Sequence, residues 1–275
     1  MSDTPGQKAL TAVLALLCVL FAALWWMGRS PAAAIVPTQP PPPPPPAAVA
    51  AEAPAPLEKL LSDSRPKVRQ KALELLAELN PQLAGREVPR LLQTEQDPSV
   101  LLAALHAAGH LKLAPAYGPV FEQLDRDDPA VRRKAAATLG QLGEALNATQ
   151  RDEAAVRIGR GLKSEQDQLG GALTPANAGA LLPYLGALSQ LGAPAGAPFL
   201  LEFLRCDVPL VRRLSAEALE RCAQAEHEKA LMAAWRGESD AMVRAAIEKV
   251  LARPPFGYAL DRERKVLVRK TEPAP

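Results

Sequence analysis

Two histidines, His106 and His110, lie four residues apart, and two glutamates, Glu74 and Glu78, have the same spacing 32 residues earlier. On an α-helix, residues four apart share one face, so each pair would project in one direction. Two histidines placed in this way can chelate zinc or a similar ion, and carboxylates can supply further ligands. A solvated polar face with histidine-carboxylate hydrogen bonds needs the same geometry, and we expect this second arrangement. The four residues therefore define a candidate site with two alternative uses.

An internal repeat places these residues on neighbouring elements. Five segments carry an aspartate, a proline or both just before a shared valine, and the valines are Val68, Val100, Val131, Val211 and Val243, separated by 32, 31, 80 and 32 residues. The segment from Ala180 supplies a sixth unit, because its LSQLG repeats the LGQLG of residues 139–143. An insertion around residues 163–177 explains its larger spacing, and we expect an enlarged loop there.

Each unit has the pattern of a helix that follows a first helix. Aspartate caps the free N–H groups of a helix start, and proline suits its first turn. The valine and the residues four and eight positions later would then face inward. Two helices per ~31 residues cannot enclose a core alone, so neighbouring units must stack.

These motifs resemble the HEAT-repeat family, in particular its short bacterial form with phycobilisome-lyase-type repeats. The pattern D-P-x-V-R-x-x-A-A-x-x-L-G-x-L-G is complete at Asp128–Gly143 and partial in the other units. The resemblance implies an all-α fold, a HEAT-like α-solenoid of about six helical hairpins over residues 57–253. It also implies a binding scaffold, by analogy with other members of the family.

A polar stripe is predicted along the concave side of this solenoid. It comprises the positions six and ten residues after each shared valine, which point away from the core. We expect a protein partner to bind the polar residues there: Glu74, Glu78, His106, His110, Gln141, Gln190, Glu217, Arg221, Lys249 and Arg253. Its first residues are acidic and its last are basic.

Arginines directly follow four of the shared valines. They are Arg69, Arg132, Arg212 and Arg244. We expect them to form a ladder of hydrogen bonds between stacked repeats, with aspartates of the preceding loops as partners: Asp97, Asp128, Asp207 and Asp240.

The N-terminal part reads as an anchor and a spacer. Residues 9–27 carry no charge and are long enough to cross a membrane, while Trp25 and Trp26 suit its boundary. A cleaved signal peptide is the alternative, but its apolar region is usually shorter. Residues 1–8 would be cytoplasmic, and residues 28–56, with seven consecutive prolines, a stiff disordered linker. This predicts a single-pass inner-membrane protein whose repeats lie on the extracytoplasmic, periplasmic side.

Composition narrows the function further. Lysine and arginine (32) barely outnumber aspartate and glutamate (30), so nucleic acid is not an expected partner. No catalytic or phosphate-binding motif appears, and we expect no enzyme activity, cofactor or small-molecule substrate. Residues 254–275 form a tail with strand character, a short hairpin or an extended peptide. We therefore expect an envelope scaffold; the alternatives are a metal-binding enzyme or sensor and a structural assembly subunit.

Overall fold

A computed structural model describes residues 54–170, 173–261 and 266–269. They belong to one compact unit, Ala50–Pro275. The predicted membrane helix (9–27) and nearly all of the predicted linker (28–56) lie outside the described residues. Among the helices that are described, none is both long and apolar enough to cross a membrane.

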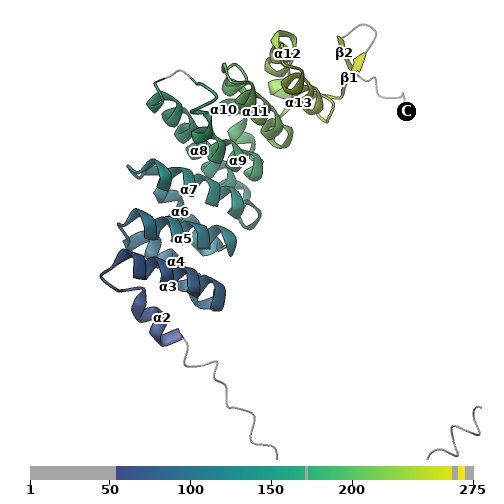
Figure 1. Ribbon diagram of the computed structural model, residues 1–275. Coiled ribbons are helices and arrows are strands. Elements are labelled where there is room, and N and C mark those ends of the chain that lie inside the picture. Colours follow the sequence, from purple (N-terminus) through teal and green to yellow (C-terminus); the bar gives the residue numbers. More distant parts are fainter. Residues whose placement is uncertain (1–53, 171–172, 262–265, 270–275) are drawn as a thin grey trace, which may run out of the picture. The chain divides into compact units, whose positions relative to one another are not determined.

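The described residues form six helical hairpins in two rows (Figure 1). The first helices of the hairpins are α2 (Pro54–Leu60), α4 (Pro81–Thr94), α6 (Tyr117–Glu122), α8 (Ala148–Gln168), α10 (Ala197–Phe203) and α12 (Glu228–Gly237). The second helices are α3 (Pro66–Leu79), α5 (Pro98–His110), α7 (Pro129–Leu142), α9 (Leu182–Leu191), α11 (Pro209–Cys222) and α13 (Ala241–Leu251). Each second helix packs against the second helix of the next hairpin. This confirms the predicted helical stack.

The second helices begin where their sequence predicts. The carboxylates of Asp97, Asp128 and Asp240 each accept hydrogen bonds from two backbone N–H groups of the following turn. These bonds satisfy donors that have no partner within the helix. A proline in the first turn, such as Pro98 or Pro129, costs nothing there, because its missing N–H would have been unpaired.

The core lies between the two rows. Val100, Val131, Val211 and Val243 are at most 1% exposed, as the repeat pattern predicts. The residues four and eight positions after each of these valines are buried as well. Val68 is only half-buried, because its hairpin is the first of the described stack and, among the described residues, has a neighbouring hairpin on one side only. The inward face predicted from sequence is therefore correct.

A close contact joins α7 and α9. A Cβ atom on Gly140 would lie 2.7 Å from the Ala187 Cα atom, nearer than real Cβ atoms approach a backbone. We expect Gly140→Val to lower the free energy of unfolding by about 2 kcal/mol, because the helices would have to separate. Gly186→Val is the matched control, since nothing lies within 4 Å of a Cβ atom there. Thermal melting followed by circular dichroism would measure both, and equal losses would contradict the close approach.

The predicted loop at residues 163–177 is wrong in its first part. Helix α8 continues to Gln168, so residues 163–168 are helical. Inward residues at helical spacing, Ile158, Leu162 and Glu165, extend its buried face. Glycines and a proline follow this run, and they misled the sequence interpretation about where the helix ends.

The tail carries two short antiparallel strands, β1 (Tyr258–Asp261) and β2 (Val266–Arg269). β1 contacts α13, and the Tyr258 hydroxyl donates to a carboxylate oxygen of Glu228 at 2.5 Å. The Phe256 side chain is 2% exposed beside them. The tail is thus packed against the last hairpin.

Candidate functional site

The polar stripe lies on the second helices of all six hairpins. Glu74 is half-buried, and the other stripe residues are exposed. They lie on α3 (Glu74, Glu78), α5 (His106, His110), α7 (Gln141), α9 (Gln190), α11 (Glu217, Arg221), α13 (Lys249) and just beyond it (Arg253). Because these helices pack side by side, the stripe residues follow one another from hairpin to hairpin.

The two glutamine positions contact the preceding helix. The Gln141 side chain lies over Gly109 of α5, and the Gln190 side chain lies close to Gly140 of α7. A larger residue at either glycine would collide with the glutamine. Because these positions are glycines, the side chains of Gln141 and Gln190 can lie across the preceding helix.

The acidic end of the stripe surrounds a hollow between α3 and α5. The predicted four side chains all line it, together with three alanines: Glu74, Glu78, His106, His110, Ala77, Ala103 and Ala107. The repeat register therefore correctly placed these side chains on one face of adjacent helices.

The predicted hydrogen bonds between glutamate and histidine are absent from the described residues. Glu74 instead accepts from Gln70 at 3.0 Å and from Lys71 at 3.1 Å. The Nδ1 atom of His106 lies 3.4 Å from the Lys134 Nζ atom. Glu74 and His106 thus have closer neighbours on α3 and on α7, and the predicted version of the site with glutamate-histidine hydrogen bonds is wrong.

Metal coordination is not supported by the geometry either. Within residues 54–170, 173–261 and 266–269, no three histidine, cysteine, aspartate or glutamate side chains come close enough together to hold an ion. The rings of His106 and His110 lie 6.0 Å apart between centroids, tilted by 35°. Structural zinc sites usually need four ligands around one point.

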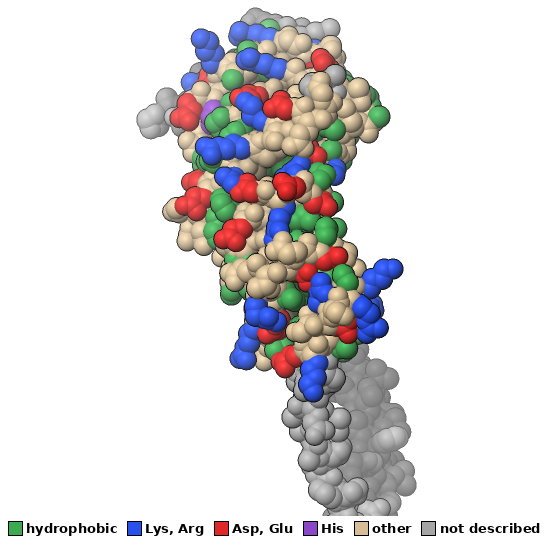
Figure 2. Space-filling model, turned by 90° about the vertical axis from the view of Figure 1, so that its left-hand side faces the viewer, with side chains coloured by type: hydrophobic (Ala, Val, Ile, Leu, Met, Phe, Trp, Pro, Cys, Tyr) green, Lys and Arg blue, Asp and Glu red, His purple; other side chains and the backbone are tan. Residues whose placement is uncertain are grey.

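The basic end of the stripe is partly neutralised. Lys249 and Arg253 both form ion pairs with Glu220, whose side chain is only 12% exposed. Glu217 pairs with Arg213 one turn earlier on α11. On the face drawn in Figure 2, acidic and basic side chains are likewise intermixed.

The arginines after the shared valines do link hairpins, but their partners are not the predicted aspartates. Arg69 donates two hydrogen bonds to Glu95 at 2.8 and 2.9 Å, and Arg212 donates two to Glu238 at the same distances. Both glutamates follow the first helix of the next hairpin. Their carboxylates are at most 8% exposed, so the ion pairs are largely desolvated.

A third buried link involves Arg132 and Glu165 of α8, with 3.4 Å between nitrogen and oxygen. Arg244 instead donates to the Glu238 carbonyl oxygen. Asp97, Asp128 and Asp240 act as helix caps, which takes up their carboxylates, and Asp207 offers Arg212 only its backbone carbonyl. The ladder therefore exists with different acidic partners from those predicted.

Burial by itself would raise the pKa of Glu95 and of Glu238. Hydrogen bonds from the paired arginine and from backbone N–H groups, together with the positive charge of the arginine, lower it below the ordinary value of 4.5. These glutamates are therefore ionised at neutral pH and hold their arginines in place.

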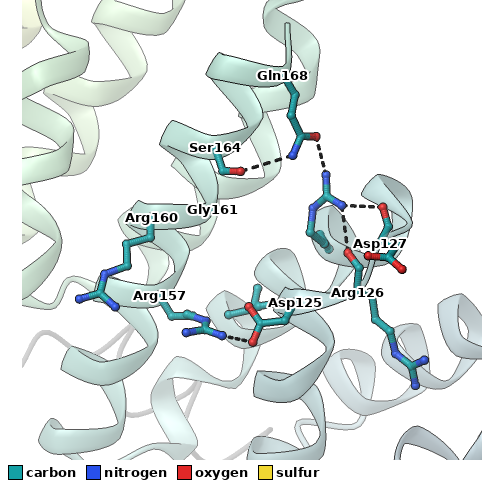
Figure 3. Close-up of a pocket in the computed structure, with 10 residues that line it drawn as sticks. Asp125, Arg126, Asp127, Arg157, Arg160, Gly161, Ser164 and Gln168 are labelled. Carbon is teal, nitrogen blue, oxygen red and sulfur yellow. Dashed lines mark hydrogen bonds and ion pairs between the residues drawn. The ribbon is translucent and has the colours of Figure 1, made fainter.

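A pocket lies where the loop before α7 meets α8 (Figure 3). Arg132 joins the carbonyl oxygens of Arg126 and Asp127 to the Gln168 side chain, and Arg157 pairs with Asp125. Most guanidinium groups around the pocket are thus already bound to protein oxygens. We regard this pocket as a product of hairpin packing, and the stripe as the better candidate site.

Residues 53–140 match the family model for HEAT repeats. This segment consists of HEAT repeats. It covers the hairpins from α2 to α7, and the HEAT resemblance in the sequence is thereby confirmed. No curated protein sequence matches the chain.

Two solved structures share the HEAT-like fold. One is an engineered protein with 20% sequence identity and a TM-score of 0.50, covering 71% of this chain and 93% of that one. The other is the complex of CpcE and CpcF of phycocyanin lyase from Nostoc sp. PCC7120, with 21% identity and a TM-score of 0.50, covering 80% of each chain. At such low identity the likeness concerns the fold alone.

Proposed function

We propose that this chain is a membrane-tethered HEAT-repeat scaffold that binds a protein partner through the polar stripe. The observation that carries the proposal is the exposure of the stripe. Six consecutive second helices bury one face in the core and present polar side chains away from it. Such a row offers hydrogen-bonding and charged groups over a long distance, which suits a protein surface better than a small molecule.

The tether rests on the sequence of residues 9–27. This stretch of 19 residues has no charge, and ~1.5 Å of helical rise per residue gives it the length of a bilayer core. The prolines that follow would hold the repeats away from the membrane surface. As part of this proposal, the repeats lie on the extracytoplasmic side of an inner membrane.

A photo-crosslinking experiment in intact membranes tests the proposal. A photoreactive residue at Gln141 or Gln190 should give a discrete crosslinked product, because both positions are exposed on the stripe. The same residue at Gln82 or Glu122, exposed on the first-helix row, is the matched control. Identical products from both rows, or none from the stripe, would refute the assigned surface.

A separate experiment tests the tether. Membranes washed with alkaline carbonate should retain the chain, and its release would refute the tether.

A further inference from the structure

The hollow between α3 and α5 has an aliphatic floor beneath a polar rim. Its volume, ≈350 Å³, is at the small end for ligand sites. Ala107 is buried, Ala77 and Ala103 are half-buried, and the outermost lining residues are Glu78, His106 and His110. A ligand entering it would meet carboxylates and imidazoles first and methyl groups below.

The rim carries two carboxylates, of which Glu74 is paired with Lys71 on the same helix. Hydrogen bonds from Lys71 and Gln70 lower the pKa of Glu74, and although burial opposes this, the charges of Lys71 and His106 lower it further. Glu78 has no hydrogen bond or ion pair with any described residue. Its exposed carboxylate is therefore available to a cation from outside.

The two imidazole rings add flat surfaces beside this carboxylate. Their centroids are 6.0 Å apart and their planes are inclined by 35°. Lys134, the cation near His106, belongs to α7 and does not line the hollow. Acidic, flat and aliphatic surfaces thus converge on one small space.

We propose that this hollow receives the guanidinium group of an arginine side chain from the protein partner. This inference rests on the proposed function, because it specifies which side chain of the protein partner contacts the acidic end of the stripe. A guanidinium is planar, stacks on ring faces and donates several hydrogen bonds to carboxylates. Its aliphatic stem would cover the alanine floor. A lysine ammonium is more strongly hydrated and lacks the flat face, so it fits less well.

Histidine NMR of the full chain in detergent tests this inference, with the peptide acetyl-Ala-Arg-Ala-amide as the probe. The chain has three histidines, and the third, His227, lies next to α12, far along the stack from the hollow. We expect the ring signals of His106 and His110 to shift and saturate with a dissociation constant on the order of 1 mM, while His227 stays in place. The same peptide with citrulline, which is neutral, should shift neither.

Two variants complete the test. Glu78→Gln should weaken binding about fivefold, and Glu122→Gln, an exposed change on α6, should leave it unaltered. An unchanged circular dichroism spectrum and melting temperature show that each variant is folded. Equal shifts with the citrulline peptide, or none with the arginine peptide, would overturn the inference. The crosslinks from Gln141 and Gln190 do not involve the hollow, so the inference can fail while the proposed function stands.

Discussion

Val131→Asp should lower the free energy of unfolding by about 4 kcal/mol, the largest loss we expect from a single substitution in this chain. Val131 is 1% exposed between α7 and its neighbours. An aspartate there would place a carboxylate among apolar side chains with no cationic partner. The melting temperature, followed by circular dichroism on the full chain, should fall by about 10 °C.

Ala130→Asp provides the control for this prediction. It introduces the same side chain one residue earlier in the first turn of α7, where the position is exposed. A carboxylate near a helix N-terminus is neutral or slightly stabilising, so the melting temperature should hardly change. Similar losses for the two variants would mean that the inward face has been assigned wrongly.

Arg212→Met should cost about 3 kcal/mol, because it leaves the Glu238 carboxylate buried without its cation. The Glu238 side chain is 5% exposed and has two hydrogen bonds from Arg212. Loss of Arg212 also leaves the Cys206 carbonyl oxygen without its donor at 2.8 Å. Chemical denaturation of the full chain would measure the change.

The double variant Arg212→Met/Glu238→Met tests whether the attraction within the ion pair exceeds the free energy that desolvating both charges costs. Replacing both charges by apolar side chains should restore stability to within about 1 kcal/mol of the original. Arg205→Met, at an exposed position in the loop before α11, should change it by less than about 0.5 kcal/mol. A double variant as unstable as Arg212→Met would show that the pair itself stabilises the junction.

Much of the fold could be predicted from the sequence because its signals are local. Valine, the residue four positions later and the residue eight positions later mark one face of a helix, and Asp128 and Pro129 mark its start. The same register placed Glu78 and His110 on adjacent helices, since equivalent positions in stacked repeats must be neighbours. All of these features follow from the spacing of residues within one helix or from one repeat to the next.

The acidic partners of the arginines could not be predicted from residue spacing. Glu95 lies 26 residues after Arg69, Glu165 lies 33 after Arg132, and Glu238 lies 26 after Arg212. The spacing varies because α8 is longer than the other first helices and carries Glu165 within the helix itself. The rotation of His106 toward Lys134 likewise depends on side-chain contacts that helical periodicity does not contain.

Among the residues that the structure describes, buried ion pairs between an arginine and a glutamate occur at alternate junctions. They join the first hairpin to the second, the third to the fourth and the fifth to the sixth, whereas leucines, Leu101 and Leu181, occupy the arginine position at the two junctions between these pairs. A buried glutamate that faces a leucine in place of its arginine would keep an uncompensated charge. Deleting the third hairpin alone would create such a mismatch, whereas deleting two consecutive hairpins would keep every buried carboxylate opposite an arginine. The array should therefore tolerate changes of length in steps of two hairpins.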